Sequence, residues 1–458
     1  MPSIRFLVAL PVDAGEAFAW HARPGAFERL TPPWDDVRLV SRTGDIRGGD
    51  VVLELRQGPV RLRWVARHSE YIEGRQFVDE QVHGPFAHWR HTHTLHPDDD
   101  GTSHLEDAIA YALPLAPLSL PAQPFVRSML RRMFAYRHAV TRADLARHRD
   151  TPRRLRIAIT GASGLIGSAL VPFLTTGGHE VVRLVRRQPR DAGEHEWSPA
   201  LGIVSPETLG RVDAVVHLAG ENVAEARWSP SVKARIRDSR VDPTRALATS
   251  LARLPHPPAT FLSASAIGIY GGRGDERLIE DSAPGTGFLA EVGQAWEAAT
   301  QPAIDAGIRV VMLRLGIVLD SRGGALRKML PPFRVGVGGP LGGGSQYFSW
   351  ISLEDVLGAV LFLLHRNAIH GPVNLTAPTP ETNAAFTRTL GTVLRRPTIV
   401  PVPAFALSAL FGEMARAELL SSKRVLPTVL ERAGFVFLHP TLEGALRHTL
   451  GTHRLEPA

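Results

Sequence analysis

The stretch that decides the fold is Ile157-Ala-Ile-Thr-Gly-Ala-Ser-Gly-Leu-Ile-Gly167, in the middle of a chain of 458 residues. It begins with apolar residues that suit a buried strand and ends in glycines at 161, 164 and 167. The apolar residues that follow recur at helical spacing: Ile166, Leu170, Phe173 and Leu174. The glycines therefore occupy a turn from a strand to a helix.

Each of the three glycines has a physical role in such a turn. Gly161 permits the tight reversal, Gly164 lets the backbone approach a pyrophosphate, and Gly167 lets the helix pack closely on the strand. The phosphates would meet the helix N-terminus, with its unpaired N–H groups and the positive end of its dipole. An ordinary glycine-rich turn is the alternative, but the flanking strand and helix favour a dinucleotide site. Pro172 falls inside the predicted helix, where we expect an irregularity.

Composition narrows the class of protein. Hydrophobic residues make up 44% of the chain and charged residues 21%, and no apolar run approaches the roughly 18 residues that span a bilayer. The N-terminus is more typical of a first strand than of a signal peptide, so we expect a cytoplasmic protein without an integral membrane segment. The lack of cysteine excludes disulfides, thiolate catalysis and cysteine metal sites.

The net charge of +7 raises the question of a nucleic-acid partner. Of the 52 basic residues 49 are arginines, and they are spread along the chain among 45 acidic residues. Dispersed charge is typical of a solvated surface, whereas a nucleic-acid footprint gathers on one face. We therefore expect no nucleic-acid partner.

The first 150 residues show strand-like alternation broken by turn signals. Two short helical stretches, 14–22 and 25–30, follow a first strand that starts at Ile4, and a long helical stretch spans 125–148. The other predicted strands are 38–41, 51–55, 60–66, 76–82, 88–95 and 103–113. The apolar face of the long helix would be Val126, Leu130, Met133, Phe134, Val140 and Leu145. This order predicts an α+β domain, a curved antiparallel sheet around one helix.

That order of elements, together with Val78-Asp-Glu-Gln-Val-His-Gly-Pro-Phe-Ala-His-Trp-Arg-His-Thr-His93, resembles the helix-grip fold of the START-like (SRPBCC) lipid-binding and polyketide-cyclase superfamily. The resemblance covers residues 1–149 and implies an apolar cavity between sheet and helix, suited to a hydrophobic small molecule. A polar segment at 150–154 is the expected linker.

Two features of this domain have competing explanations. His91 and His93 share one face of a strand and could bind a metal, but with no third ligand placed we expect structural histidines and no metal site. The long helix carries six arginines, which would fit an anionic membrane surface or, as we favour, a solvated outer face. They are Arg127, Arg131, Arg132, Arg137, Arg142 and Arg147.

After the glycine turn a second strand, 179–185, ends at Arg186 and Arg187, where an acid would bind the ribose of NAD. A guanidinium instead matches a 2′-phosphate, so we predict NADP(H), with a surface pair of arginines as the alternative. The next strand runs from Asp213 into Ala219 and Gly220, whose small side chains leave room for a cofactor beside the backbone.

Four motifs in this order resemble an extended short-chain dehydrogenase/reductase: the glycine turn, His217-Leu-Ala-Gly220, Ser263-Ala-Ser-Ala-Ile-Gly-Ile-Tyr-Gly271 and Val311-Met-Leu-Arg-Leu-Gly-Ile-Val-Leu319. Further motifs resemble the narrower YfcH-like sugar-nucleotide epimerase family. They are Arg227-Trp-Ser229, Ser239-Arg-Val241, Lys328–Arg334, Gly336–Gly342 and Trp350–Asp355. The resemblance implies a Rossmann fold, a doubly wound parallel sheet at 155–394, with the family's small C-terminal extension at 395–458.

Carried over from that family, the NADP contacts would be Gly161, Ser163, Gly164, Leu165, Ile166, Gly167, Arg186, Arg187, Leu218, Ala219, Gly220, Arg240 and Val318. Arg240 stands four residues before Thr244, where other extended members usually place an asparagine near the cofactor. A cation there would add a second phosphate partner.

The reductases of this superfamily use a tyrosine and a lysine four residues later for proton transfer. None of the five tyrosines is followed by a lysine at that spacing, and Leu289 and Gly293 stand where the pair should be. Ser265 and Tyr270 remain as catalytic candidates, with a turn cap and a pocket wall as their structural alternatives. Glu280 and Asp281 are more typical of a loop surface.

Two hypotheses of different classes remain. The first is an NADP(H)-dependent oxidoreductase or epimerase-like enzyme acting on an unidentified small molecule, with an accessory domain for a hydrophobic ligand. The second is a non-catalytic NADP(H)-binding sensor, which the missing tyrosine-lysine pair favours. The glycine-rich stretch 336–344 could be a substrate lid or a flexible connection.

Overall fold

The computed structural model describes residues 3–115, 117–151, 153–203, 205–221, 223 and 227–452. The chain folds into two compact units. One comprises Met1–Pro152 with the short segments Pro172–Gly178 and His448–Ala458, and is called the N-terminal unit below. The other comprises Arg153–Val171 and His179–Arg447, and is called the Rossmann unit.

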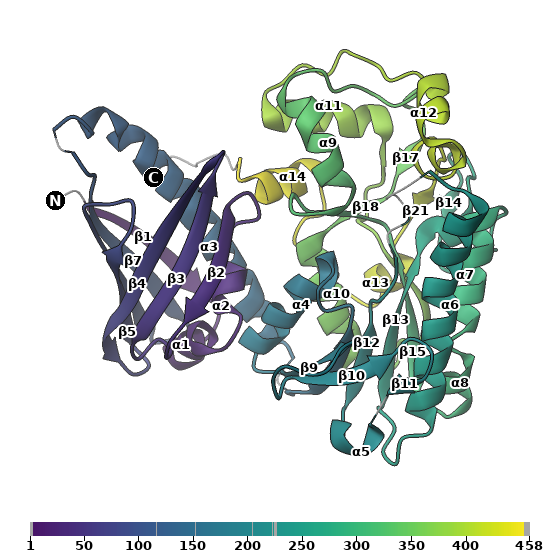
Figure 1. Cartoon of the computed structure of the whole chain (residues 1–458), viewed down its shortest axis with the longest axis horizontal. Helices are drawn as coiled ribbons and strands as arrows, with labels where there is room; N and C mark the ends of the chain where they lie inside the picture. The colour runs from purple at the N-terminus through teal and green to yellow at the C-terminus, as the bar shows by residue number, and fades with distance from the viewer. Residues whose placement is uncertain are drawn as a thin grey trace. The chain divides into compact units, whose positions relative to one another are not determined.

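The N-terminal unit is a seven-stranded antiparallel sheet with one long helix, as predicted. In chain order its elements are β1 (Ser3–Leu10), α1 (Ala14–Ala22), α2 (Ala26–Leu30), β2 (Asp36–Arg42), β3 (Gly49–Gln57), β4 (Val60–Ile72), β5 (Gln76–His83), β6 (His88–Pro97), β7 (Ser103–Ala112) and α3 (Gln123–Arg149). The strand order is β1-β7-β6-β5-β4-β3-β2, so each strand from β2 to β7 pairs with its neighbour in sequence, and β1 closes the sheet on β7. Figure 1 shows α3 running along one face of this twisted sheet.

The core of the N-terminal unit lies between α3 and the alternating strands. Four of the six residues predicted for the inner face of α3 are buried: Leu130, Phe134, Val140 and Leu145. The ring of Phe134 stacks on Phe6 of β1, with ring centroids 4.7 Å apart. Buried and half-buried residues alternate strictly along β7, because successive side chains point to opposite faces of a sheet.

The Rossmann unit contains an eight-stranded sheet in the order β11-β10-β9-β8-β12-β13-β15-β19. Its strands are β8 (Arg156–Thr160), β9 (Glu180–Val185), β10 (Glu194–Ser198), β11 (Gly202–Ile203), β12 (Ala214–His217), β13 (Thr260–Ala266), β15 (Arg309–Leu315) and β19 (Gly371–Leu375). All neighbours pair in parallel except β10 and β11. From β8 the chain adds β9, β10 and β11 on one side, and it then crosses over to add β12, β13, β15 and β19 on the other side. The strand order therefore reverses between β8 and β12. This is the doubly wound topology that the resemblance to extended short-chain dehydrogenases/reductases implies.

Helices cover both faces of this sheet (Figure 1). They are α4 (Leu165–Thr176), α6 (Pro230–Ala252), α7 (Phe288–Ala298), α8 (Gln301–Asp305) and α10 (Leu353–His365). The other helices up to residue 394 are α5 (Pro206–Leu209), α9 (Gly324–Arg334) and α11 (Asn383–Leu394), of which α9 and α11 pack on each other away from this sheet. Pro172 does not end α4: the helix continues to Thr176, whose hydroxyl donates to the Pro172 carbonyl at 2.8 Å.

The C-terminal segment returns to the carboxyl edge of the sheet. It contains α12 (Ala404–Phe411), a π-helical turn η3 (Ala415–Leu419), β21 (Arg424–Val425), α13 (Thr428–Arg432) and α14 (Leu442–Leu450). β21 pairs in parallel with β14 (Arg277–Leu278), which follows β13 and the 3-10 helix η2 (Ile267–Tyr270). This pairing brings residues 413–423 beside the turn that follows β13.

Two smaller pairings complete the unit. β16 (Ile317–Leu319) pairs with β18 (Trp350–Ser352), and β17 (Tyr347–Phe348) pairs with β20 (Glu381–Thr382).

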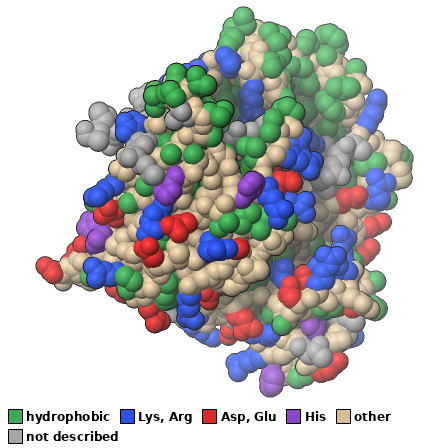
Figure 2. Space-filling view, turned by 60° about the vertical axis from the view of Figure 1, so that its left-hand side comes forward, with side chains coloured by type: hydrophobic (Ala, Val, Ile, Leu, Met, Phe, Trp, Pro, Cys, Tyr) green, Lys and Arg blue, Asp and Glu red, His purple; other side chains and the backbone are tan. Residues whose placement is uncertain are grey.

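Basic and acidic side chains are interleaved on the face of the molecule drawn in Figure 2, and that face shows no large patch of one charge. Among the described residues, no helix has the length and apolar character needed to cross a membrane.

Candidate functional site

The glycine loop joins the ends of β8 and β12. Gly161 has φ +70°, a left-handed conformation that favours glycine, and a β-carbon there would lie 2.8 Å from the carbonyl group of Leu218 and 2.9 Å from the nitrogen of Ala219. No side chain fits at 161 while the two loops stay this close. The crevice where the strand order reverses is the ligand site of doubly wound sheets, so the structure brings these three predicted residues together at the expected place.

The rest of the loop forms the N-terminus of α4. A β-carbon on Gly167 would lie 2.2 Å from the Gly161 carbonyl oxygen, so close packing requires glycine there, whereas one on Gly164 would lie 3.3 Å from the same atom. Ser163 and Gly164 are exposed just before the helix begins at Leu165. The first N–H groups of a helix have no partner within it, so this exposed end is open to phosphate oxygens.

Val318 and Leu165 both lie close to Gly324. A β-carbon on Gly324 would lie 3.4 Å from a methyl of Leu165 and 3.5 Å from the carbonyl oxygen of Val318. The segment after Gly316 therefore approaches the glycine loop, as the resemblance implies. Contact of Val318 with a cofactor remains a prediction.

Arg186 and Arg187 follow β9 in sequence but differ in their surroundings. Arg187 forms two hydrogen bonds of 2.7 Å to the carboxylate of Glu194, and this partner lowers the pKa of Glu194 to about 2. The Arg186 side chain is exposed, and the described part of the chain offers its guanidinium no hydrogen bond or ion pair. Of the two predicted phosphate partners, Arg186 is thus the one available to a ligand.

Arg240 of α6 lies under the loop that follows β12. Its guanidinium donates to the carbonyls of Glu221 at 2.6 Å and of Ile236 at 2.9 Å, and it lies 5.1 Å from the ring centre of Trp296. A β-carbon on Gly220 would lie 3.7 Å from the guanidinium. Burial lowers the pKa of Arg240 to about 10, which still leaves it charged at neutral pH. The structure thus shows a cation that holds this loop, and its contact with phosphate remains a prediction.

A buried polar network that the sequence analysis missed supports both loops. The Thr160 hydroxyl lies 2.7 Å from Nδ1 of His217, whose Nε2 lies 3.0 Å from the hydroxyl of Thr244. Thr160 also accepts the N–H of Leu218 at 3.2 Å, and Trp296 donates to Thr244 at 3.0 Å. Burial lowers the pKa of His217 to about 4, so this histidine is neutral at pH 7.

The positions of the missing tyrosine and lysine are filled by tight packing. Leu289 and Gly293 lie on α7, which packs against η2. A β-carbon on Gly268 would lie 3.3 Å from Cβ of Leu289, and one on Gly293 would lie 2.9 Å from Cβ of Ile269. A lysine at 293 would therefore require α7 to move away from η2.

Ser265 and Tyr270, the two catalytic candidates, are buried and paired with protein groups. The Ser265 hydroxyl donates to Oε1 of Glu297 at 2.7 Å, and the Tyr270 hydroxyl donates to Oδ1 of Asn374 at 2.8 Å. Arg314 joins the two, with bonds of 2.8 and 2.9 Å to the Glu297 carboxylate and one of 2.8 Å to the Tyr270 oxygen. Burial raises the pKa of Tyr270. Their catalytic role stays a prediction, and this geometry favours the structural alternative.

The expectation that Glu280 belongs to a loop surface is wrong. Its side chain is buried, and Oε1 accepts the N–H groups of Asn374 at 3.1 Å and Val429 at 3.2 Å. Burial raises the pKa of Glu280. The carboxylate ties β19 to the C-terminal segment, a connection between distant parts of the chain that local sequence does not reveal. Asp281 is exposed, as expected.

A cavity of about 490 Å³, called the lysine pocket below, lies at the carboxyl end of β13. Its walls are the turn from Gly268 to Gly274, the start of α7 with Leu289, and the C-terminal residues 413–423. Lys423 lines it and is 6% exposed, and its ammonium donates to the Ala417 carbonyl at 2.9 Å. Burial lowers the pKa of this lysine. Lys423 could not be assigned to a site from sequence, because it is far from every motif of the glycine loop.

The glycine-rich stretch 336–344 packs against the same C-terminal segment. A β-carbon on Gly339 would lie 1.8 Å from the Val400 carbonyl oxygen, and one on Gly342 would lie 2.9 Å from a methyl of Leu420, which lines the lysine pocket. The glycines therefore permit close backbone packing beside the pocket wall.

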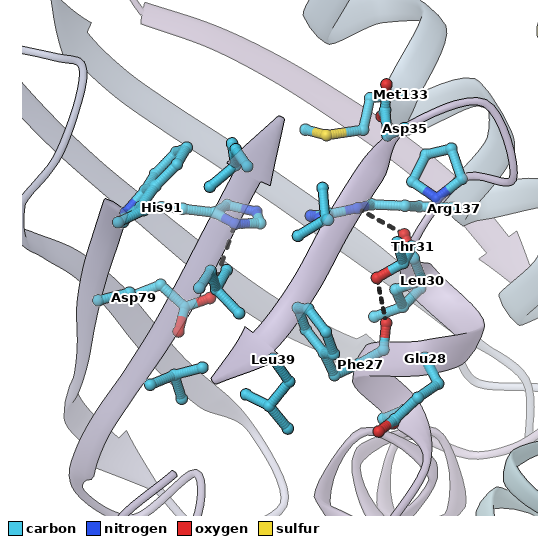
Figure 3. A pocket seen from close by; sticks show the side chains of 18 of the residues that line it. Phe27, Glu28, Leu30, Thr31, Asp35, Leu39, Asp79, His91, Met133 and Arg137 are labelled. Atoms are coloured by element: carbon cyan, nitrogen blue, oxygen red, sulfur yellow. Dashed lines mark hydrogen bonds and ion pairs between the residues drawn. The ribbon is translucent and has the colours of Figure 1, made fainter. Parts of the chain in front are cut away.

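A second cavity, of about 400 Å³, lies inside the N-terminal unit and is called the N-terminal cavity below. Figure 3 shows apolar side chains such as Phe27, Leu39 and Met133 around it, with Asp79, His91 and Arg137 at its polar parts. Arg137 departs from the predicted solvated face of α3, because it lines the cavity and donates to the Leu30 carbonyl at 3.1 Å.

Comparison with protein families gives three matches along the chain. Residues 157–375 match the NAD dependent epimerase/dehydratase family, residues 10–135 match the polyketide cyclase / dehydrase and lipid transport family, and residues 402–449 match a domain of unknown function. The two resemblances drawn from sequence motifs are confirmed.

Among individual proteins, the epimerase family protein Mb2239 of Mycobacterium bovis is 48% identical over 290 residues, 63% of this chain and 96% of that protein. Human epimerase family protein SDR39U1 is 35% identical over 296 residues, 64% of this chain and 99% of that protein.

Two solved structures are also similar. The structure of a nucleoside-diphosphate sugar epimerase from Corynebacterium glutamicum covers 99% of this chain and 91% of its own, with 35% identity and a TM-score of 0.81. That of human SDR39U1 with NADPH covers 64% of this chain and 98% of its own, with 33% identity and a TM-score of 0.60. The chain therefore belongs to the epimerase family of extended short-chain dehydrogenases/reductases, and it joins this domain to an N-terminal polyketide-cyclase-like domain.

Proposed function

We propose that the protein is an NADP(H)-dependent oxidoreductase whose small-molecule substrate binds in the lysine pocket. The observation that carries this proposal is the position of a buried lysine in a cavity at the sheet edge that also holds the glycine loop. In doubly wound sheets the ligands bind at the carboxyl ends of the strands. β8, β12 and β13 are adjacent and parallel, so the glycine loop and the lysine pocket share that edge.

NADP(H) is favoured over NAD(H) by the exposed guanidinium of Arg186 after β9. A relative that is 33% identical in structure comparison, human SDR39U1, was crystallised with NADPH. The residues that would hold the dinucleotide are the Gly161–Gly167 loop, Arg186, Leu218 and Ala219. Gly161 keeps the crevice free of a side chain, and the exposed N-terminus of α4 offers N–H groups to the pyrophosphate.

NADPH held by these residues would supply a hydride to a carbonyl carbon of the substrate. The carbonyl oxygen must then take a proton. In related reductases a tyrosine donates this proton, but here Leu289 stands at that position and has no proton to donate. The Lys423 ammonium is the buried proton donor of the pocket wall, and giving up its proton is eased because burial lowers its pKa. The neutral amine left behind regains a proton from water. The carbonyl carbon would thus gain the hydride and its oxygen the lysine proton, in a two-electron reduction balanced by conversion of NADPH to NADP⁺.

The test is NADPH oxidation by the full chain over a panel of carbonyl compounds, measured with NADPH affinity on the same samples. Lys423→Met should lower kcat by about 10²–10⁴-fold, the usual contribution of a general acid, while the Kd for NADPH changes less than about twofold. Lys328→Met is the matched control, since Lys328 does not line the pocket. Equal turnover in the wild type and Lys423→Met would remove the lysine from the mechanism.

A non-catalytic NADP(H)-binding protein is the second candidate. It is favoured by the packing of Leu289 and Gly293 against η2 and by the pairing of Ser265 and Tyr270 with protein groups. Tight NADPH binding with no oxidation over a broad panel of carbonyl compounds would establish this second function and exclude the first.

We propose further that the N-terminal cavity binds a hydrophobic small molecule, as the match to the polyketide cyclase and lipid transport family supports. The proposed functional boundaries are 1–149 for this domain, 150–154 for the linker, 155–394 for the cofactor domain and 395–458 for the extension. Binding of an apolar fluorescent probe to the full chain tests this cavity. Leu39→Glu in the cavity wall should weaken probe binding, and Leu7→Glu at an exposed position should leave it unchanged.

A further inference from the structure

A cluster of histidine and aspartate side chains lies at one end of the N-terminal cavity. Asp79 on β5 is directly opposite His91 on β6 in the sheet register, and His93 is two residues further along the same face. One ligand atom from each of the three residues lies within 4.8 Å of the others. His91 and His93 are buried, and all three residues line the cavity. Figure 3 shows Asp79 and His91 beside it.

The separations of these atoms suit a shared metal ion. Nε2 of His93 lies 3.2 Å and Nδ1 of His91 lies 3.9 Å from the same carboxylate oxygen of Asp79. Donors that bind one ion at about 2.1 Å lie about 3.0–3.4 Å apart in octahedral or tetrahedral geometry. The His93–Asp79 pair already has this separation, and the His91–Asp79 pair would have to close by about 0.5–0.9 Å for an ion to bind between them.

Asp107 on β7 lies against both rings, holding His91 by a hydrogen bond and His93 by an ion-pair contact. Its Oδ1 lies 2.9 Å from Nε2 of His91 and 2.8 Å from Nδ1 of His93. Each imidazole thus turns one nitrogen to Asp107 and the other toward Asp79. A histidine ligand usually donates its second N–H to a carboxylate in this way, which sets the tautomer and orients the ring.

Both carboxylates are held in turn by other histidines. Oδ2 of Asp107 lies 2.6 Å from Nε2 of His138 on α3, and Oδ1 of Asp79 lies 2.8 Å from Nε2 of His68 on β4. His68 thus contacts Oδ1 of Asp79, and Oδ2 of the same carboxylate faces His91 and His93. The cluster is built from side chains of five elements: β4, β5, β6, β7 and α3. A chance cluster of surface residues would not need contributions from so many elements.

We propose that Asp79, His91 and His93 bind a divalent first-row transition-metal ion, with Asp107 as the positioning residue for both imidazoles. Two imidazoles and one carboxylate are ligands for Zn²⁺, Fe²⁺, Co²⁺ and Ni²⁺, and three protein ligands leave coordination positions open. The three residues line a cavity of about 400 Å³ whose other walls are mostly apolar. Arg137 also lines it, so the ligand class is an apolar molecule with an anionic oxygen, such as a carboxylate.

The rival explanation is a metal-free network of ion pairs, in which a protonated His93 bridges the two aspartates. Titration of the chelator-treated full chain with Zn²⁺, and with Co²⁺ followed by its visible absorption, separates the two. The metal site predicts one ion bound per chain in the wild type and its loss in His91→Ala/His93→Ala. The matched control is His83→Ala/His96→Ala, which removes two exposed histidines of β5 and β6 and should bind as the wild type does.

Asp107→Asn tests the positioning role. It should weaken Zn²⁺ binding by about 10–100-fold without changing the number of ions bound. X-ray absorption of the zinc-loaded unaltered chain avoids any folding defect of the variants, and two imidazole ligands are the expected result. The proposal is overturned if no ion is bound, if wild type and His91→Ala/His93→Ala bind equally, or if the bound zinc has no imidazole ligand. NADPH affinity of the same samples gives a separate readout, since these residues belong to the N-terminal unit and the glycine loop to the Rossmann unit.

Discussion

Replacement of Arg186 by alanine tests the cofactor assignment in the sharpest way that the structure allows. The Arg186 guanidinium is exposed and has no partner in the described part of the chain, so its removal breaks no internal bond. Any change in affinity then reports on the ligand alone. NADPH carries the 2′-phosphate that this guanidinium would meet, and NADH lacks it.

The magnitude follows from the bond that would be lost. A hydrogen bond to a charged group contributes about 1.5–3 kcal/mol, and solvent exposure of Arg186 reduces this to about 1–2 kcal/mol. The Kd for NADPH should therefore rise about 5–30-fold, since 1.4 kcal/mol corresponds to a factor of ten. The Kd for NADH should change less than about twofold, because its ribose presents no phosphate.

Isothermal titration of the full chain with each cofactor measures both constants. Arg187→Ala is the matched control: that guanidinium is held by two 2.7 Å bonds to Glu194, so its loss should weaken NADPH binding less than the loss of Arg186. Equal weakening of NADPH and NADH by Arg186→Ala, or a larger effect from Arg187→Ala, would refute the phosphate argument.

Three further predictions concern the framework of the Rossmann unit. Gly161→Ala should abolish measurable NADPH binding, whereas Gly164→Ala should retain it in part, because a β-carbon meets backbone at 2.8 Å in the first case and 3.3 Å in the second; calorimetric titration compares the two. His217 has a folded pKa of about 4 against 6.5 unfolded, so the unfolded state binds more protons and stability is lost as the pH falls from 6.5 to 4, by about 3 kcal/mol. Denaturant unfolding of wild type and His217→Gln over that range measures this, and identical pH dependence would contradict it. Glu297→Gln should lower the free energy of unfolding by about 3–5 kcal/mol, because it leaves Arg314 buried without its ion pair, and a change below about 1 kcal/mol would contradict the structure of that network.

Most helices and strands could be predicted from the local periodicity of hydrophobic residues. The alternation along 88–95 and 103–113 predicted strands that proved to be β6 and β7, and helical spacing predicted α3 within two residues of its observed ends. The glycine turn predicted the β8–α4 unit, and the resemblance carried by all four motifs implied the doubly wound sheet. These elements are set by near neighbours in sequence, which explains why pattern alone finds them.

Which polar residues line the two cavities depends on contacts between segments that are separated in sequence. Lys423 reaches the lysine pocket because β21 pairs with β14, about 150 residues earlier, and two-residue strands leave no periodic signal. The third residue of the proposed metal site, beside His91 and His93, is Asp79, which the strand register places opposite His91. That register depends on the hairpin between β5 and β6, whose geometry the sequence did not define.

The central claim, that a hydride moves from NADPH to a substrate carbonyl at the lysine pocket, is tested most directly by isotope transfer. The full chain is incubated with NADPH deuterated at the transferable position and with the pooled carbonyl compounds, and products are read by mass spectrometry. We predict deuterium in an alcohol product with the wild type and at least tenfold less with Lys423→Met. Deuterium that stays on NADPH while the cofactor binds tightly would contradict the claim and leave a protein that binds NADP(H) without catalysis.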